Sequence, residues 1–326
     1  MLTGEFHPVF EPWVVEAIAE ITPWWVAFVL VFLTHLGSVY VLVPLVLLAY
    51  WRDYERMGPW LGIVIGYYAL MASVKSLNSA VRPDVAPPVS ADPFPEVFLG
   101  SYSHATAIST TSFPSGNVMA ITIVAGLVVL DTRVSTFRRR ASAAALLVSV
   151  VAYTRLALGV HYPVDVIGGA VIGLGYLAGV TWLRKRVDDE TRALFAFGAV
   201  CAFVSLWLVN GLTTLPTFEA MSGSNRVVAF GAAVGGLLSW SLVHWNGHTP
   251  RTLDRTPAPA IALVAVVTMV YVVHGAIAHP LVTMGWSAIA MVGIVALPWV
   301  VPDSQTLSSW LKQLLSGVTR KQSRTR

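Results

Sequence analysis

The chain has 326 residues, of which 56% are hydrophobic and only 12% are charged, and its mean hydropathy is +0.68. Because a soluble domain carries about 25% charged residues, this composition excludes a water-soluble globular protein. The formal net charge is +4, and the single cysteine, Cys201, excludes a disulfide within the chain.

Apolar runs recur along the chain, and many reach the roughly 20 residues that cross the hydrocarbon core of a bilayer. A backbone in lipid must satisfy its own hydrogen bonds, so each run is expected to be a helix. A short interfacial helix is expected at 9–21. We predict an all-α, multi-pass membrane bundle of about nine transmembrane helices, at 24–50, 57–80, 114–131, 141–158, 163–183, 193–213, 226–246, 259–279 and 282–301.

The basic residues predict the orientation of this bundle. With the N-terminus outside, 17 of the 21 lysines and arginines fall on the cytoplasmic side, which positive residues prefer. The C-terminus is then cytoplasmic, and the basic loops face anionic lipid head groups rather than nucleic acid. Residues 1–23 carry four glutamates but no lysine or arginine, so no cleavable signal peptide is expected. The basic residues left outside are Lys75, Arg82, Arg155 and Arg226.

Two of these outside cations precede the first long loop. Lys75 and Arg82 are seven residues apart, so two helical turns are expected to align them on one face. Pro83 is expected to end that helix. The loop that follows, about 83–112, is rich in Pro, Ser and Thr and is a candidate lid.

A second motif lies directly before the span at 114–131. Pro114 suits the first turn of a helix, and the free N–H groups that follow it are suited to binding a phosphate. Ser115 adds a hydroxyl donor, and Gly116 allows an anion to approach the backbone closely. Taken alone, this pattern is also typical of an ordinary helix start.

The third motif joins Arg155 to a His–Asp pair. Gly159 and Pro163 predict a tight outside turn that contains His161, and Asp165 follows four residues later in the first turn of the next helix. A carboxylate that holds one imidazole nitrogen leaves the other free to attack an electrophile.

All three motifs are predicted on the same side of the membrane. Cations around a phosphoryl group and an in-line nucleophile are the requirements of phosphoryl transfer. No cluster of carboxylates suggests a two-metal site. The pattern therefore indicates transfer through a phosphohistidine, without a metal or other cofactor.

These motifs resemble the signature of the type 2 phosphatidic acid phosphatase superfamily, whose helical core is shared with vanadium haloperoxidases. Its K-x6-R-P motif matches Lys75 to Pro83, and P-S-G-H matches Pro114 to Gly116. Its S-R-x5-H-x3-D motif matches Arg155 to Asp165, with Thr154 in place of serine. The resemblance implies a nucleophilic His161 oriented by Asp165. It implies phosphate binding by the side chains and backbone of Lys75, Arg82, Arg155, Ser115 and Gly116.

One position departs from this family pattern. Asn117 stands where the family has a second histidine, which is thought to protonate the leaving group, and an amide cannot supply that proton. Activity is then slow, absent or confined to good leaving groups, which favours a polyprenyl pyrophosphate over a phosphatidate-type monoester. His104, in the preceding loop, is a candidate substitute acid.

The resemblance also divides the chain. We expect an N-terminal segment with the first transmembrane helix at 1–56, a phosphatase-like catalytic core at 57–186, accessory transmembrane helices at 187–303, and a basic amphipathic cytoplasmic tail at 304–326.

The implied activity is hydrolysis of a lipid phosphate or pyrophosphate at the extracytoplasmic face of the plasma membrane. Two alternatives remain open at this point. One is transfer of the phosphoryl group to an alcohol or sugar acceptor, and the other is a catalytically weak relative that binds or transports phospholipid.

Overall fold

The computed structural model describes residues 12–108, 110–210, 212, 215–221, 224–245 and 279–300, and every helix or strand assigned in these ranges is a helix. The elements are α1 (Pro12–Ile21), α2 (Trp24–Leu33), η1 (Thr34–Gly37), α3 (Val39–Arg52), α4 (Tyr54–Ser76), η2 (Glu96–Phe98), α5 (Leu99–Thr106), α6 (Gly116–Asp131), α7 (Phe137–Ala157), α8 (Pro163–Arg184), α9 (Glu190–Trp207), α10 (Phe218–Met221), α11 (Asn225–Trp245) and α13 (Pro280–Val300). The expected multi-pass helical bundle is confirmed.

Six of the described helices are long and apolar enough to cross a membrane, and a seventh span is counted if α1 and the bent segment Trp24–Gly37 are taken together. The shorter apolar helices α3 and α6 come in addition. The number nine is therefore not confirmed among the described residues. The span expected at 259–279 and the tail at 304–326 lie outside them.

The prediction of one continuous helix at 24–50 is wrong. The segment breaks into α2, the 3-10 turn η1 and α3, with Ser38 in an extended conformation at the last break. Gly37 lies against α6 so closely that an added Cβ would be 2.6 Å from the carbonyl oxygen of Asn117. The break therefore packs closely against α6, which the surrounding apolar run does not indicate.

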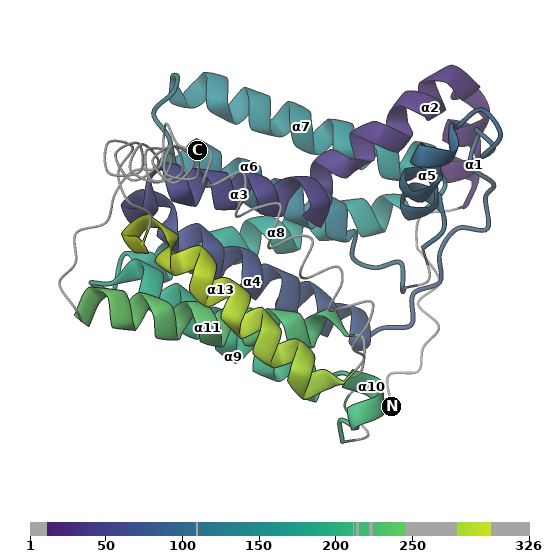
Figure 1. Ribbon diagram of the computed structural model, residues 1–326. Helices are drawn as coiled ribbons and strands as arrows, with labels where there is room; N and C mark the ends of the chain where they lie inside the picture. The colour runs from purple at the N-terminus through teal and green to yellow at the C-terminus, as the bar shows by residue number, and fades with distance from the viewer. Residues whose placement is uncertain are drawn as a thin grey trace, which may run out of the picture.

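The long helices run side by side, with loops gathered at the two ends of the bundle (Figure 1). Small residues let neighbouring helices approach, as is common in membrane bundles. An added Cβ on Gly169 of α8 would lie 2.6 Å from the carbonyl oxygen of Ser115, at the start of α6. On Gly62 of α4 it would lie 2.4 Å from the backbone of Leu194 in α9.

One end of the bundle is closed by ion pairs. Arg184, at the end of α8, lies 2.9 Å from Asp131 at the end of α6 and 2.6 Å from Glu190 at the start of α9. The Nε1 of Trp60 also donates to Asp131. The arginines at the start of α7 belong to the same end, because α6 ends and α7 begins there.

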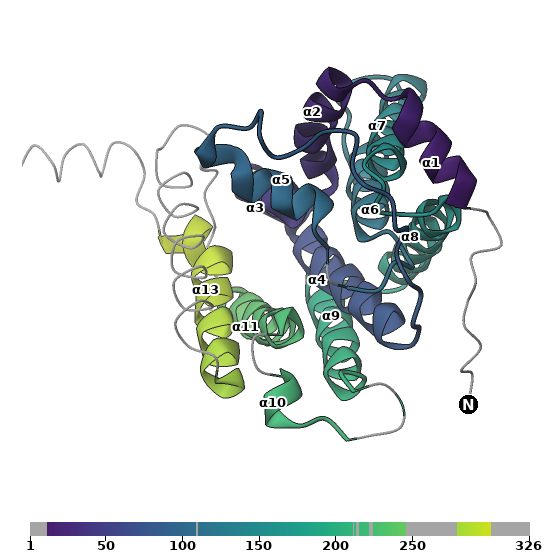
Figure 2. The same cartoon turned by 90° about the vertical axis from the view of Figure 1, so that its right-hand side faces the viewer.

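The opposite end is where α4 and α7 end and α6 and α8 begin. There, Asn78 Nδ2 donates to the carbonyl of Phe113 at 3.0 Å, and the backbone N–H of Ser115 donates to the carbonyl of Asp165 at 2.9 Å. Seen from this end, α5 lies across the bundle beside α2 and α3 (Figure 2). A second apolar cluster, separate from the main core, joins α2 to the loop segments through Leu30, Phe94 and Leu158.

Helices α9, α11 and α13 form a layer on the α4 side of the bundle (Figure 2). Arg226, near the start of α11, connects this layer to the end of α4, because its Nη2 donates to the carbonyl of Ala72 at 3.1 Å and to the hydroxyl of Ser76. Arg226, which the sequence left among the outside basic residues without a role, therefore joins the accessory helices to the expected core.

Candidate active site

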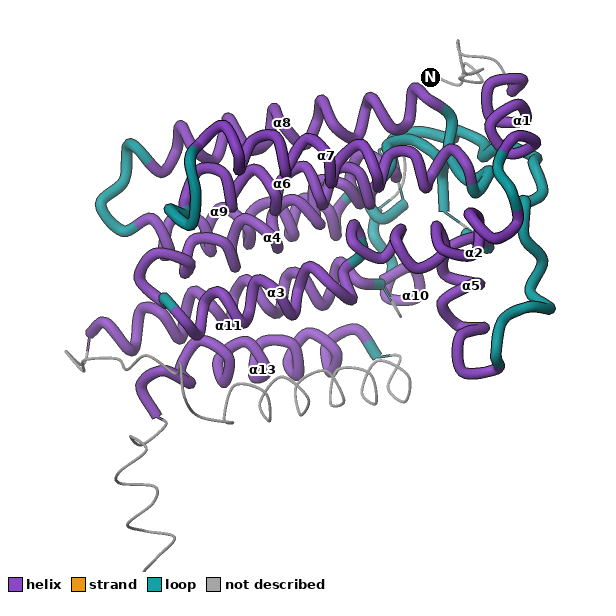
Figure 3. Tube along the Cα trace, turned by 90° about the horizontal axis from the view of Figure 1, so that it is seen from above, coloured by secondary structure: helices purple, strands orange, loops and turns teal. Residues whose placement is uncertain are grey.

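The three sequence motifs lie in the loops and helix ends where α4 and α7 end and α6 and α8 begin, which we call the motif end. Figure 3 shows the loops of this end at the right of the bundle. His161 is in the short turn between α7 and α8. This turn requires Gly159, whose φ is +70° and whose added Cβ would lie 2.8 Å from the carbonyl oxygen of Val85. Pro163 then begins α8 and brings Asp165 into its first turn.

Asp165 holds His161 in position. Its Oδ2 lies 3.3 Å from His161 Nδ1 and accepts the backbone N–H of Tyr162 at 2.8 Å. Ser112 Oγ donates to the same oxygen and lies 3.5 Å from His161 Nδ1. The histidine, the aspartate and the serine are at most 3% exposed. A carboxylate that accepts this many hydrogen bonds remains ionised and fixes the orientation of the ring.

Arg82 determines the tautomer of His161. Its Nη1 lies 3.3 Å from His161 Nε2. Because a guanidinium can only donate, Nε2 is the acceptor, and the ring proton is assigned to Nδ1, where it faces Asp165. Nε2 therefore presents a lone pair next to a cation, which is the state that nucleophilic attack on a phosphoryl group requires.

Backbone carbonyls hold the two cations of the first motif. Arg82 donates from Nε to Thr110 at 2.8 Å, from Nη1 to Val160 at 2.7 Å and from Nη2 to Thr111 at 3.1 Å. Lys75 Nζ donates to the same Thr111 carbonyl. The two side chains therefore converge on one loop segment, which also positions Ser112.

The expectation that these two cations share one helical face is wrong. α4 ends at Ser76, so Arg82 lies in extended chain beyond the helix. Asn78 causes this early end, because its Nδ2 donates to the carbonyls of Val74 and Phe113 while its Oδ1 accepts the N–H of Ala80. The loop after α4, and not a shared helical face, therefore brings Lys75 and Arg82 to the same Thr111 carbonyl.

Arg155, in the last turn of α7, is 2% exposed. Its Nη1 donates to Thr34 Oγ1 at 2.7 Å and lies 3.5 Å from the carbonyl oxygen of Ala105. Among the described residues its Nε has no hydrogen-bond partner. A buried donor without a partner costs about 1–3 kcal/mol, so this nitrogen is available to an anion.

The second motif adds a buried hydroxyl and an amide. Ser115 is fully buried, and within the described ranges its Oγ also has no partner. Gly116 begins α6, and an added Cβ there would lie 2.5 Å from the sulfur of Met71, so a larger residue requires the Met71 side chain of α4 to move. Asn117 Nδ2 donates to the carbonyl of Thr34 at 3.1 Å.

His104, the expected substitute acid, is an exposed residue of α5 that stacks on His35 with ring centroids 5.3 Å apart. Partial burial of this ring is the main cause that lowers the pKa of His104, and the charges of His35 and Arg155 lower it further. The Nε2 of His35 is buried and, in the part of the chain that the structure describes, has no partner.

Sequence reasoning did not select Ser112, Thr34 or His35. Ser112 lies two residues before Pro114 of the second motif, so its position in the sequence could have indicated a place at the site. The polar break around Thr34 was the signal for the other two.

Burial lowers the pKa of His161 to about 3, although the hydrogen bond to Asp165 acts in the opposite direction. The folded state therefore keeps this imidazole neutral below pH 6.5, whereas the unfolded chain takes up a proton. As the pH falls from 6.5 to 5 we expect the wild-type protein to lose stability through this residue, with a slope that approaches about 1.4 kcal/mol per pH unit. Thermal unfolding in detergent of the wild type and His161→Gln measures the effect, and equal pH slopes would contradict it.

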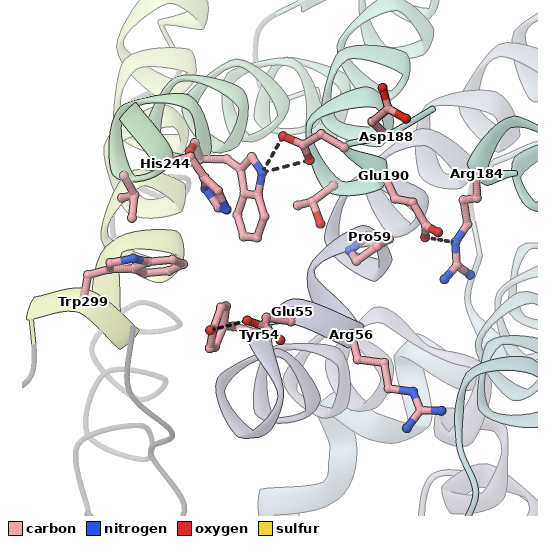
Figure 4. Close-up of a pocket in the computed structure, with 13 residues that line it drawn as sticks. Tyr54, Glu55, Arg56, Pro59, Arg184, Asp188, Glu190, His244 and Trp299 are labelled. Atoms are coloured by element: carbon pink, nitrogen blue, oxygen red, sulfur yellow. Dashed lines mark hydrogen bonds and ion pairs between the residues drawn. The ribbon is translucent and has the colours of Figure 1, made fainter. Parts of the chain in front are cut away.

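A cavity of about 710 Å³ lies at the opposite end of the bundle, between the start of α4 and the ends of α11 and α13 (Figure 4). Its charged lining residues are Glu55, Asp188, Asp189, Glu190, Arg56 and Arg184. Four carboxylates outnumber two guanidinium groups, and one of these, on Arg184, is paired with Glu190. Such a lining repels a phosphate, so we place the candidate active site at the motif end.

A protein-family model matches the part of the chain that contains all three motifs. The family model described as the PAP2 superfamily matches residues 58–189. Among solved structures, a transmembrane PAP2-type phosphatidylglycerolphosphate phosphatase from Bacillus subtilis is similar, with 25% sequence identity and a TM-score of 0.44 over 54% of this chain and 85% of that chain. None of the curated proteins compared with the chain matches it significantly.

Proposed function

We propose, from the match of residues 58–189 to the PAP2 superfamily model, that the protein is an integral membrane phosphatase acting on a lipid-borne phosphate ester or pyrophosphate. In this proposal Lys75, Arg82 and Arg155 bind the phosphoryl group and His161 attacks it. The positive charge comes from these side chains, so the reaction requires no resident metal.

The observation that carries the proposal is the environment of His161 Nε2. This nitrogen is an oriented acceptor 3.3 Å from the guanidinium of Arg82. The orienting carboxylate of Asp165 is on the other ring nitrogen. Among the described residues, Arg155 Nε and Ser115 Oγ are buried donors without a hydrogen-bond partner. An anionic, tetrahedral group accepts from such donors and presents its central atom to the imidazole lone pair, whereas an apolar ligand does neither.

The chemistry follows from these positions. The lone pair of His161 Nε2 forms a bond to phosphorus while the bond from phosphorus to the leaving oxygen breaks, and that oxygen takes the electron pair. The new imidazolium is stabilised by Asp165 through Nδ1–H. Water then attacks the phosphohistidine, the P–N bond breaks towards Nε2, and inorganic phosphate is released. During attack, the substrate replaces the imidazole as the partner of Arg82 Nη1.

We propose a polyprenyl pyrophosphate as the preferred substrate, with a phosphatidate-type monoester second. Asn117 has no titratable proton to give to a leaving alkoxide. A phosphate leaving group needs less protonation. General acid catalysis typically contributes about 10²–10⁴-fold, so the preference for a pyrophosphate is largest where no other group of the site supplies this proton.

We also propose that the site faces the extracytoplasmic side of the plasma membrane. The candidate site lies at the bundle end opposite the Arg184–Asp131 ion pair and the arginine-rich start of α7. Because positive residues favour the cytoplasmic side, this arrangement supports an outside N-terminus and a cytoplasmic C-terminus.

The proposed function is tested with the purified protein and a panel of polyprenyl pyrophosphates, lipid phosphate monoesters and soluble phosphate esters in the presence of a chelator. We expect release of inorganic phosphate that is fastest with the pyrophosphates. Release that disappears with the chelator would contradict metal independence. Transfer to an added alcohol or sugar without phosphate release would favour the phosphotransferase, and binding without either reaction would favour the phospholipid-binding relative.

A further inference from the structure

We infer that His35 of η1 is the acid that protonates the leaving oxygen, a role that Asn117 cannot perform. The inference rests on the proposed function and assigns the proton donor of the same site. It is carried by the position of η1 at the site, by the unpartnered Nε2 of His35 and by the neighbours of its ring.

η1 is part of the site because it is hydrogen-bonded to α6, which begins in the second motif, and to α7, which carries Arg155. Thr34, which precedes His35, accepts Arg155 Nη1 at its hydroxyl and Asn117 Nδ2 at its carbonyl. Gly37, two residues after His35, lies against the backbone of Asn117. The break in the apolar run at 24–50 therefore brings an imidazole next to the side chain that lacks a proton.

The ring of His35 is held from one side by α5. His104 stacks on it at an interplanar angle of 15°, and Tyr40 packs edge-on against His104 at 5.0 Å. The next residue of α5, Ala105, has its carbonyl 3.5 Å from Arg155 Nη1. The histidine stack and the buried guanidinium consequently adjoin the same turn of α5, and a phosphoryl group on Arg155 lies within reach of this stack.

Nε2 of His35 is buried without a hydrogen-bond partner among the described residues. Leaving a buried polar atom unpaired costs about 1–3 kcal/mol, and a leaving oxygen supplies the missing partner. Burial and the nearby charge of Arg155 disfavour the imidazolium of His35, whereas a backbone hydrogen bond with Ser101 favours it. On balance the free protein disfavours this imidazolium, whereas a bound phosphate dianion favours it.

The proton balance closes over two steps. While His161 Nε2 bonds to phosphorus, the protonated Nε2 of His35 gives its proton to the leaving oxygen, and a neutral alcohol or phosphate departs. The neutral His35 then takes a proton from the attacking water as the P–N bond breaks. Inorganic phosphate leaves, and His35 is protonated again for the next cycle.

The experiment compares two substrates in the purified full-length protein: a long-chain alkyl phosphate, whose alkoxide needs a proton, and p-nitrophenyl phosphate, whose leaving group does not. The first-turnover release of the leaving group is measured, because it reports cleavage of the P–O bond alone. We expect His35→Gln to slow the alkyl substrate by about 10²–10⁴-fold and the aryl substrate by less than about 10-fold. His104→Gln, which alters the neighbouring ring of the same stack, should affect both substrates by less than about 10-fold.

Restoring a histidine to the second motif provides an independent variant. In the His35→Gln background, Asn117→His should recover at least about 10-fold of the alkyl rate, since it returns an acid to the site. In the wild-type background, where His35 is present, the same substitution should change that rate by less than about threefold. This second comparison does not depend on the folding of any His35 variant.

Three results would overturn the inference: equal slowing of both substrates by His35→Gln, no slowing of either, or a large gain from Asn117→His alone. The proposed function fails differently. In that case the wild-type protein shows no leaving-group release that depends on His161, whichever residue occupies position 35.

Discussion

Replacing His161 with alanine is expected to lower phosphate release by at least about 10⁴-fold, as is typical when an enzyme loses its nucleophile. No other described imidazole combines an orienting carboxylate, here Asp165 at 3.3 Å, with an adjacent guanidinium. The measurement is kcat for the best substrate of the panel. It is combined with trapping of the labelled phosphoenzyme, whose P–N bond should be labile in acid and absent from the variant.

His244→Ala is the matched control for this substitution. His244 lies in α11 at the edge of the cavity shown in Figure 4, far from the motif end of the bundle, and we expect it to be neutral in the assay. A His161→Ala protein that keeps more than a tenth of the wild-type rate would remove His161 from the mechanism. Loss of activity in both variants would instead indicate general damage to the fold.

The prediction of a helical membrane bundle is confirmed, and it was possible because helices are local. Helix ends in a bundle alternate between two sides, which is why the sequence placed the three motifs at one end. Once α7 and α8 are joined by a turn at Gly159, the His161–Asp165 pair must lie at that end. The catalytic and binding roles of these residues stay predictions.

Contacts between distant segments could not be predicted in this way. Thr34 and Arg155 are 121 residues apart, and Asn117 and Thr34 are 83 apart. No periodicity links such positions. The break at η1 was also concealed, because its few polar residues lie within a run that is apolar enough for one continuous span.

The same limit applies to the accessory helices. The sequence assigned no role to Arg226. In the structure its Nη1 donates to the carbonyl of Ser205 at 3.2 Å, and its Nη2 donates to the carbonyl of Ala72 near the end of α4. Only the packing of α9 and α11 on α4 brings these carbonyls together. A lone basic residue near a span end is compatible with a snorkelling side chain, a phosphate ligand or a helix contact, and its neighbours in space distinguish these roles.

Arg155→Lys is expected to lower kcat by about 10²–10³-fold, which is the usual loss when one preorganised donor to a developing charge is removed. The substitution keeps the charge, so the loss must come from geometry. The guanidinium is 2% exposed and donates to Thr34 Oγ1 through Nη1, which leaves Nε for the phosphoryl group. An ammonium is a compact point charge and cannot present two donors in this fixed arrangement.

Arg226→Lys is the matched control for the Arg155 substitution, because Arg226 is a half-buried arginine near a helix end on the same side of the bundle. Its guanidinium donates to backbone carbonyls and to Ser76, and among the described residues no hydrogen bond joins it to the three motifs. We expect thermal stability to fall in this variant while kcat changes by less than about threefold. An Arg155→Lys protein with wild-type kcat and KM would show that the buried guanidinium does not meet the reacting group. The convergence of Arg82, Arg155 and His161 at one end of the bundle would then be a feature of packing alone.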